Sequence, residues 1–458
     1  MRRMRGEGWT MKDLTEGNEA RLLVSFSIPM LFGNLFQQLY NMVDSVVVGN
    51  WVGKEALAAV GASFPVIFLL LSLFMGLSMG ANILISQFHG ARDSERVRLS
   101  IETNYLFTFW AGLVLTAVGF FGAEPIMMLL QSPPEVLPQA ALYLRLYSLG
   151  MLFFLGFNTV SGILRGLGDS KNPLWMLAIS TVLNIALDLL FVIVFHWGVM
   201  GVAVATIISQ GVALGLALAY LNRTHELLRV DFRKLRFDRE IFMSSVRIGI
   251  PSGIQQSLVA LGISTMTGIV NGFGTDAIAG YAAATRIESI ASLPAMTIGM
   301  ALSTFVGQNL GAGKPERVRR GLNAALIFSV SISIAAAAVF HFAGDALVAM
   351  FNSDPGVLEA GAGYLRIIGP FFVVFSVMFM LNGVIRGAGE TLIPLASTLV
   401  AMWLVRVPTA FALSRLLGLQ GVWFAFPTGW IVGTLVAFVY YRTGRWMKTF
   451  ERIHSRRG

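Results

Sequence analysis

Residues 162–169 read Gly-Ile-Leu-Arg-Gly-Leu-Gly-Asp, and residues 383–390 read Gly-Val-Ile-Arg-Gly-Ala-Gly-Glu. The two stretches lie 221 residues apart in a chain of 458. The same shift places Gln-Phe-His-Gly-Ala at 87–91 on Gln-Asn-Leu-Gly-Ala at 308–312, and after three intervening residues each is followed by Glu-Arg-Val-Arg. Pro173 likewise falls on Pro394. The chain therefore consists of two halves built to one plan.

The composition indicates that these halves lie in a membrane. Hydrophobic residues make up 55 % of the chain and charged residues only 13 %, with a mean hydropathy of +0.70. A soluble domain carries about 25 % charged residues. Two apolar halves with one design are typical of secondary transporters.

Each half supplies six apolar stretches of about 20 residues or more, the length that a helix needs to cross the hydrocarbon core. In the first half they lie near 22–48, 57–85, 100–121, 140–163, 173–195 and 199–221. In the second half they lie near 243–270, 277–306, 321–342, 361–384, 393–415 and 419–441. Because six is even, both halves insert with the same orientation. The sequence thus predicts an all-α integral membrane protein of 12 transmembrane helices in two parallel six-helix repeats.

The basic residues predict the orientation of the protein in the membrane. Of 34 Lys and Arg, 28 fall on the two termini and on one set of loops, and the opposite loops carry four. By the positive-inside rule both termini are cytoplasmic. The N-terminal stretch lacks a small-residue cleavage site, so we expect the first helix to be retained. We expect a multi-pass protein of the cytoplasmic (inner) membrane, a monomer whose basic loops contact lipid headgroups and not nucleic acid.

The organisation follows from these counts. We expect a cytoplasmic N-terminal segment at 1–21, a first lobe at 22–222, a cytoplasmic linker at 223–242, a second lobe at 243–441 and a cytoplasmic tail at 442–458. The linker is either a plain connector or a helix lying on the inner leaflet.

Motifs for other functions are missing from the sequence. It contains no Gly-x-x-x-x-Gly-Lys-Ser/Thr phosphate loop, no His-Glu-x-x-His and no cysteine. We therefore expect neither an enzyme nor a metal centre, and no cofactor beyond a coupling ion. The glycine pairs in 166–168 and 387–389 are interpreted as tight helix exits.

Polar residues predict an ion-coupling site in the first half. Asp44 lies about one turn inside the outer end of the first span, and Asn184 and Asp188 share one face of the fifth. Thr206 lies at a similar depth on the sixth span. Ionisable groups inside a membrane are costly and are therefore functional candidates. The cluster is a candidate proton or sodium site, and the alternative is a set of satisfied interhelical hydrogen bonds.

The second half has no acid at the equivalent positions, because Asp188 maps to Thr409. Its intramembrane charges are Glu288 and Arg286 on the eighth span and Arg406 on the eleventh. Glu288 and Arg406 lie near the midplane, where they either form a buried ion pair or leave Glu288 to bind a cationic substrate. Candidate substrate contacts are Asn34, Gln37, Tyr40, Gln255, Gln256 and Glu288.

The whole chain resembles the multidrug and toxic compound extrusion (MATE) transporters. The resemblance is carried by the two six-helix halves, by Pro29 and Asp44 in the first span, and by the motifs that follow the second and fourth spans. Asp44, Asn184, Asp188 and Thr206 match the polar cluster of the DinF-like branch. In that branch the cluster is implicated in proton coupling, and Pro29 matches a proline at which the first helix bends. The NorM-like branch carries acids where this chain has Gln255 and Gln256.

The resemblance implies a V-shaped fold and an antiporter. Such a protein exports amphiphilic, often cationic compounds in exchange for protons or sodium, by alternating access between its lobes. Two alternatives stay open. One is a flippase of lipid-linked or polysaccharide precursors from the same wider superfamily, for which a cavity lined by several arginines would argue. The other is a membrane receptor or passive channel.

Overall fold

The computed structural model describes residues 12–224 and 234–455, and every regular element in these ranges is helical. The first half contains α1 (Glu19–Val47), η1 (Val48–Val52), α2 (Lys54–Gly90), α3 (Ser94–Leu129), α4 (Leu137–Leu149), α5 (Met151–Gly166), α6 (Lys171–Asp188), η2 (Leu189–Val194) and α7 (Val199–Thr224). The second half contains α8 (Arg239–Asn271), α9 (Thr275–Gly311), α10 (Pro315–Ala349), α11 (Pro355–Ile368), η4 (Gly369–Phe371), α12 (Phe372–Gly387), α13 (Leu392–Thr398), η5 (Leu399–Arg406), α14 (Val407–Leu417), α15 (Leu419–Arg442) and α16 (Arg445–Ser455).

The described residues contain up to twelve candidate membrane spans, in agreement with the number that the sequence predicts. Eleven helices are long and apolar enough to cross a bilayer, and α4 with α5 forms a twelfth span with a bend of 47°. Both halves break the fourth span, the first at Gly150 and the second at Gly369 and Pro370, where proline supplies no N–H. Several spans extend past the predicted apolar stretches, since α10 runs from Pro315 while its apolar part begins near 321.

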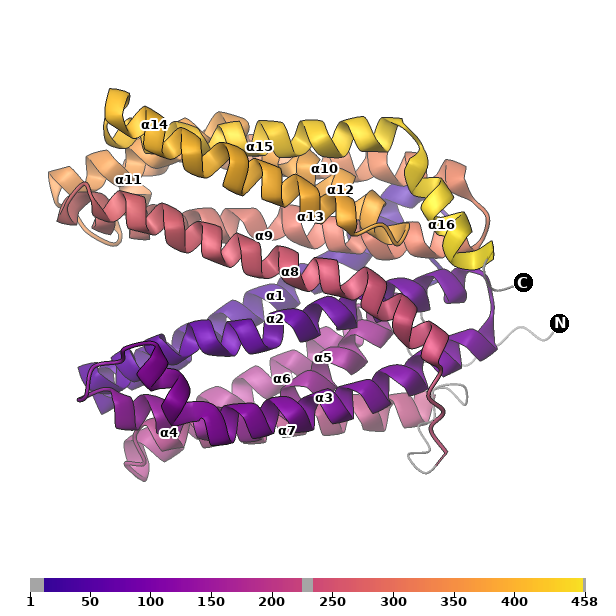
Figure 1. Ribbon diagram of the computed structural model, residues 1–458, viewed down its shortest axis with the longest axis horizontal. Helices are drawn as coiled ribbons and strands as arrows, with labels where there is room; N and C mark the ends of the chain where they lie inside the picture. Colours follow the sequence, from indigo (N-terminus) through magenta and orange to yellow (C-terminus); the bar gives the residue numbers. More distant parts are fainter. Residues whose placement is uncertain (1–11, 225–233, 456–458) are drawn as a thin grey trace. The chain divides into compact units, whose positions relative to one another are not determined.

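The chain forms two compact units (Figure 1). The first contains residues 12–14 and Ile28–Val246, and the second contains Thr15–Ser27 and residues from Arg247 onward. In each unit the long helices run side by side (Figure 1). The units differ from the expected lobes at two short segments, because the first turns of α1 belong to the second unit and those of α8 to the first.

Polar contacts explain this exchange of segments. In the second unit, Arg317 Nη1 donates to the carbonyl oxygen of Gly17 at 2.9 Å and pairs with Glu19 Oε1 at 3.0 Å. In the first unit, the backbone N–H of Arg236 donates to Glu102 Oε2 and that of Asp238 to Thr103 Oγ1, both at 3.0 Å. Residues 234–238 are not helical, and the remainder of the candidate interfacial helix, 225–233, lies outside the described residues.

The repeated glycine motif packs α5 against α2 and α12 against α9. A Cβ at Gly166 would lie 2.8 Å from Asn82 Oδ1, and one at Gly383 would lie 2.6 Å from the carbonyl oxygen of Gly299. Gly168 and Gly389 have φ of +89° and +87°, a conformation that favours glycine. The predicted tight helix exits are confirmed.

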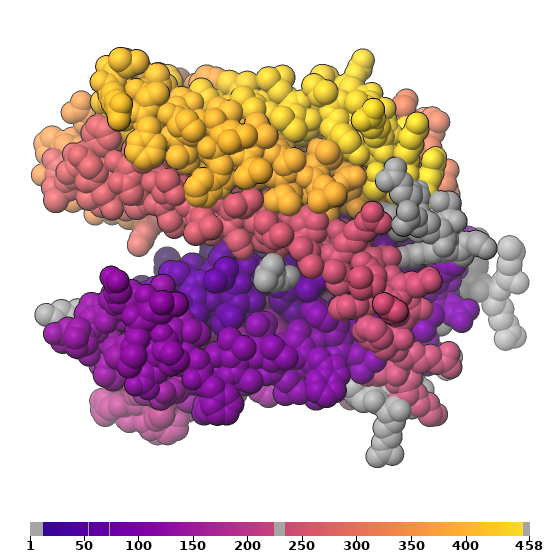
Figure 2. All heavy atoms as spheres, viewed as in Figure 1, coloured from indigo at the N-terminus to yellow at the C-terminus, as the bar shows by residue number. Residues whose placement is uncertain are grey.

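Large apolar side chains cover the outside of α3. Trp110, Phe121 and Leu129 are exposed on this helix. Atoms of this part of the chain form much of the visible face of the first unit (Figure 2). An exposed apolar surface of this kind suits contact with lipid.

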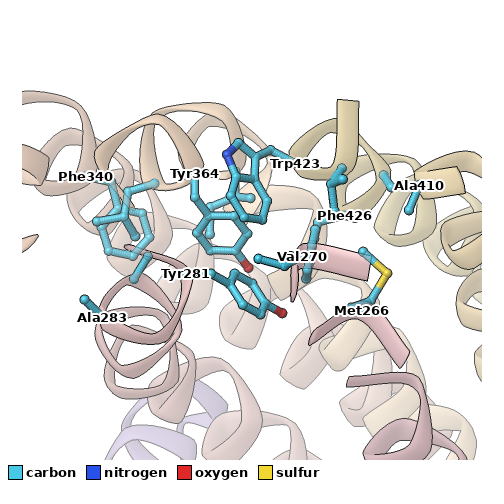
Figure 3. Packing of buried hydrophobic residues seen from close by; sticks show 14 of the residues in the cluster. Met266, Val270, Tyr281, Ala283, Phe340, Tyr364, Ala410, Trp423 and Phe426 are labelled. Carbon is cyan, nitrogen blue, oxygen red and sulfur yellow. The ribbon is translucent and has the colours of Figure 1, made fainter. Parts of the chain in front are cut away.

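The interior of the second unit is an aromatic core. Tyr281 stacks on Trp423 with ring centroids 5.4 Å apart, and Tyr364 packs edge-on against Trp423 and Phe426 (Figure 3). These rings come from α9, α11 and α15, so the core joins three of the unit's helices. Aromatic pairs in such edge-on and offset arrangements add to the stability gained from burial.

Candidate ion-coupling site

The first unit brings the predicted polar cluster together. Asp44 comes from α1, Asn184 and Asp188 from α6, and Thr206 from α7. The carboxyl groups of Asp44 and Asp188 lie next to each other. The hydroxyl of Tyr40, one turn before Asp44, donates to Thr206 Oγ1 at 2.9 Å. Three helices therefore converge on one pair of acids.

The cluster is buried, and most polar atoms of its acids and its amide lack hydrogen-bond partners. Asp188 and Asn184 are 0 % exposed and Asp44 is 9 % exposed. Among the described residues, Asp44 Oδ1, both carboxylate oxygens of Asp188 and both amide atoms of Asn184 have no hydrogen-bond partner. Buried polar groups are normally hydrogen-bonded. The reading of the cluster as satisfied interhelical hydrogen bonds therefore does not account for it.

No described basic side chain forms a salt bridge with either carboxylate. Two adjacent carboxylates in a low-dielectric interior repel each other and lack hydration. The pair can hold a shared proton, or a cation coordinated by the side-chain oxygens of Asp44, Asp188, Asn184 and Thr206.

Irregular helix geometry adjoins both acids. Asp188 is the last residue of α6, directly before the π-helical segment η2, and Asp44 lies four residues before η1. π-Helical turns within α-helices occur frequently at functional sites. The two acids are thus placed where the helical hydrogen-bond pattern changes.

Two tyrosines of α4 were missed by the sequence analysis. Tyr143 and Tyr147 lie close to Asp44, and their rings are 5.9 Å apart. Their spacing of four residues on one helix face was the available signal. Nothing in the sequence indicated which span this face would meet.

Pro29 lies inside α1, one residue beyond the boundary between the two units at Ser27 and Ile28. Its ring supplies no N–H, so one helical hydrogen bond is missing there. Pro251 lies similarly inside α8, four residues past the boundary at Arg247.

The candidate substrate contacts have different surroundings. Asn34 and Gln37 are partly buried on α1, and Gln256 is exposed on α8. Gln255 is buried and held within the second unit, because its Nε2 donates to Thr398 Oγ1 at 2.7 Å and its Oε1 accepts from Arg386 Nη2 at 2.8 Å. These bonds give Gln255 a structural role in this arrangement.

Glu288 and Arg406 form no direct salt bridge among the described residues, although each lies close enough to interact with the other electrostatically, so their pairing stays a prediction. Glu288 Oε2 instead accepts a hydrogen bond of 2.6 Å from the hydroxyl of Tyr364. The guanidinium carbon of Arg406 lies 4.9 Å from the Phe426 ring centroid and 5.8 Å from that of Trp430. Aromatic rings thus contact the Arg406 guanidinium directly. Arg286, expected to be an intramembrane charge, is exposed on α9.

Arg165 and Arg386, one in each copy of the repeated glycine motif, lie in the last turns of α5 and α12. Both are only partly exposed, and the Nε atom of each is buried without a hydrogen-bond partner in the described part of the chain. The two arginines occupy matching positions of the repeated motif, and this match in the sequence indicates that they share a role.

Eleven to twelve candidate spans in the described residues, an internal duplication and a buried pair of acids are features of a membrane transporter. The model of the MatE family matches residues 29–190 and again 251–412, once in each half. The chain therefore belongs to the MATE family of membrane transporters.

Relatives and solved structures match along nearly the whole chain. The chain is 34 % identical over 440 residues to the probable multidrug resistance protein YpnP of Bacillus subtilis (strain 168), covering 96 % of this chain and 98 % of that protein. It is 26 % identical over 417 residues to the FAD transporter of Shewanella oneidensis, covering 89 % and 91 %.

A multidrug resistance MATE family transporter of the MOP superfamily, solved in an outward-facing conformation, matches with a TM-score of 0.88 at 25 % identity. The match covers 98 % of this chain and all of that one.

Proposed function

We propose that the protein is a secondary active multidrug exporter of the DinF-like branch. It expels amphiphilic, often cationic organic compounds in exchange for protons or sodium, by alternating access between its two lobes. The observation that carries the proposal is the carboxylate pair of Asp44 and Asp188, buried next to each other without a basic partner. The printed name of the Bacillus subtilis relative supports the multidrug assignment.

Coupling follows from the charge of the pair. A proton or cation entering from outside neutralises the acids and removes the repulsion between α1 and α6. Because Tyr40 on α1 donates a hydrogen bond to Thr206 on α7, the resulting shift of α1 also moves α7. Pro29 lets α1 bend where a backbone hydrogen bond is already missing. This shift releases substrate outward, and loss of the ion to the cytoplasm resets the site.

The test is export of a fluorescent organic cation from proteoliposomes under a pH gradient or, separately, a sodium gradient. Asp44→Asn and Asp188→Asn should abolish gradient-driven export, because neither variant retains two acids to exchange an ion. Both variants should insert and fold, since asparagine is nearly isosteric with aspartate. Glu124→Gln is the matched control, because Glu124 sits in an exposed salt bridge with Arg145. Wild-type rates for Asp44→Asn under both gradients would remove the acid pair from the mechanism.

Export of an anionic aromatic compound is a second candidate. Arg406 is buried on the faces of Phe426 and Trp430, and its Nε has no hydrogen-bond partner among the described residues. A cation on aromatic faces can bind a planar anion. The relative that is a FAD transporter supports this candidate. Competition between a flavin nucleotide and the fluorescent cation for binding to the purified protein would distinguish the two substrate classes.

A further inference from the structure

A second group of buried polar residues extends from the carboxylate pair toward the start of α6. Thr181 and Asn184 lie on α6 and Gln210 lies on α7, and they are 2 %, 0 % and 3 % exposed. Within residues 12–224, Thr181 Oγ1, both amide atoms of Asn184 and Gln210 Oε1 have no hydrogen-bond partner. These unpaired atoms continue the row that begins at Asp188.

Helix geometry aligns the row. Thr181, Asn184 and Asp188 are spaced three and four residues apart and share one face of α6, and Thr206 and Gln210 share one face of α7. The hydroxyl of Ser180 donates to the carbonyl oxygen of Ser209 at 2.8 Å, which fixes the two helices at this level. Thr181 and Gln210, the next residue on each of these antiparallel helices, therefore lie within about 3 Å of the same depth. At 1.5 Å per residue the row from Asp188 to Thr181 is about 10 Å long.

The second half shows that the fold does not need polar residues at these positions. The 221-residue shift places Thr181 and Asn184 on Met402 and Val405. In the last span, where Gly198 and Gly201 align with Gly418 and Gly421, Gln210 falls on Trp430. The same scaffold thus packs apolar side chains at these positions. Unpaired buried polar groups cost stability, so their presence in the first unit points to a role beyond packing.

The kinds of unpaired atom identify the ligand. The asparagine NH2 only donates, the carboxylate oxygens, Asn184 Oδ1 and Gln210 Oε1 only accept, and the Thr181 hydroxyl can do both. A bare cation satisfies acceptors alone, while water satisfies both kinds.

We propose that Thr181, Asn184 and Gln210 form a hydrated relay that carries protons between Asp188 and the cytoplasmic half of the first unit. The inference rests on the proposed proton coupling and on the topology that the charge pattern predicts. The titratable groups around the Asp44–Asp188 pair are Tyr40 on α1 and Tyr143 and Tyr147 on α4. None of these groups lies on the α6–α7 face between Asn184 and the start of α6. This face is therefore the route by which a proton leaves the acid pair.

An apolar layer closes the inner end of the relay. Met176, Ala213 and Ala217 are buried on α6 and α7. They lie between Thr181 and the end of the helix pair at which α6 begins and α7 ends. Beyond them, Asn172 Nδ2 donates to Tyr220 Oη at 2.7 Å and to Asp169 Oδ2 at 2.5 Å. A proton on the relay therefore reaches the cytoplasm only when α6 and α7 separate at this layer, which prevents leakage.

The test uses Thr181→Val and Gln210→Leu, singly and combined, in proteoliposomes with an imposed pH gradient and no sodium. The double variant should lower proton-driven export by about 100-fold, the lower range for a lost proton-transfer group. Its thermal stability should equal or exceed that of the wild type, because unpaired buried groups are removed. Its affinity for the fluorescent cation should not change. The solvent deuterium isotope effect on export should rise from the wild type to the single variants, as proton transfer becomes rate-limiting.

Ser180→Ala is the control, since it removes a neighbouring hydroxyl that already has a partner; it should lose stability and keep its export rate per folded protein. Wild-type export by the double variant would overturn the relay alone. A slow double variant that has also lost stability and substrate affinity would overturn it in favour of a packing role. Export by the wild type under a sodium gradient only would overturn proton coupling itself, and the relay with it.

Discussion

Asp188 and Arg406 are both buried charges, and their surroundings differ because of two side chains on the last span of each half. Along the row that begins at Asp188 the last span offers Thr206 and Gln210, which are polar. At the corresponding positions the second half has Phe426 and Trp430, whose faces contact the Arg406 guanidinium. Gly429 makes room for this side chain, since a Cβ there would lie 2.9 Å from Arg406 Nε. The two halves share one backbone arrangement. The first half buries the negative charge of Asp188, and the second buries the positive charge of Arg406.

The hydrogen bond between Tyr364 and Glu288 predicts how substitutions of Glu288 act. Glu288→Gln should change stability little, because the amide oxygen can still accept from the buried Tyr364 hydroxyl. Glu288→Leu should cost about 1–3 kcal/mol, because it leaves that hydroxyl unsatisfied. Adding Tyr364→Phe to Glu288→Leu should recover part of the loss. Thermal unfolding in detergent measures all three.

If Glu288→Gln instead destabilised as much as Glu288→Leu, and Arg406→Gln restored stability, the two charges would be energetically paired despite the absence of a salt bridge. Arg145→Gln is a control for losing an exposed charge, since its salt bridge with Glu124 lies at the surface and contributes about 0–1 kcal/mol.

At the scale of the helix, glycines set how closely the spans approach. α12 meets α9 at Gly383 and Gly387, where a Cβ would lie 2.6 Å and 2.5 Å from the backbone carbonyl oxygens of Gly299 and Ser303. Backbone atoms cannot move aside as a flexible side chain can. Small residues at helix contacts are the usual means of close packing in membranes.

Gly383→Ala should therefore destabilise the second unit by about 1–3 kcal/mol, the usual cost of overpacking. Gly363→Ala is the matched control on α11, because no atom lies within 4 Å of a Cβ at that position. It should be neutral or stabilising by up to about 1 kcal/mol, since alanine favours the helix. Equal unfolding temperatures for the two variants would show that the α9–α12 contact accommodates the added methyl group without loss of stability.

Replacing Pro29 should change the export rate more than it changes substrate binding. Pro29→Ala restores a backbone N–H and allows the missing hydrogen bond in α1, so the helix becomes harder to bend. We expect slower export at saturating substrate with little change in the substrate dissociation constant, measured by stopped-flow efflux and equilibrium binding. A variant that binds more weakly but turns over normally would argue against bending at this residue.

At the scale of the whole chain, the predicted topology can be tested in this cysteine-free protein. Single cysteines at Ser94 and Glu316, both exposed next to the basic loops, should react with an impermeant maleimide only from the cytoplasmic side. Cysteines at Glu135 and Ser353, exposed in the opposite loops, should react only from outside. The reason is the uneven distribution of Lys and Arg between the loops. Labelling of the Ser94 and Glu316 variants from opposite faces would contradict parallel repeats.

The sequence by itself determined the number of spans, the duplication, the family and the members of the acid cluster. These follow from local properties: apolar length, a shift of 221 residues, and a spacing of four between Asn184 and Asp188. Tertiary structure decided which helix face each side chain meets. It gave Glu288 a hydrogen bond from Tyr364, placed Arg165 and Arg386 in the last turns of α5 and α12, and assigned the first turns of α1 and α8 to the opposite units. Such contacts join residues far apart in the chain, and their partners depend on packing that no local pattern encodes.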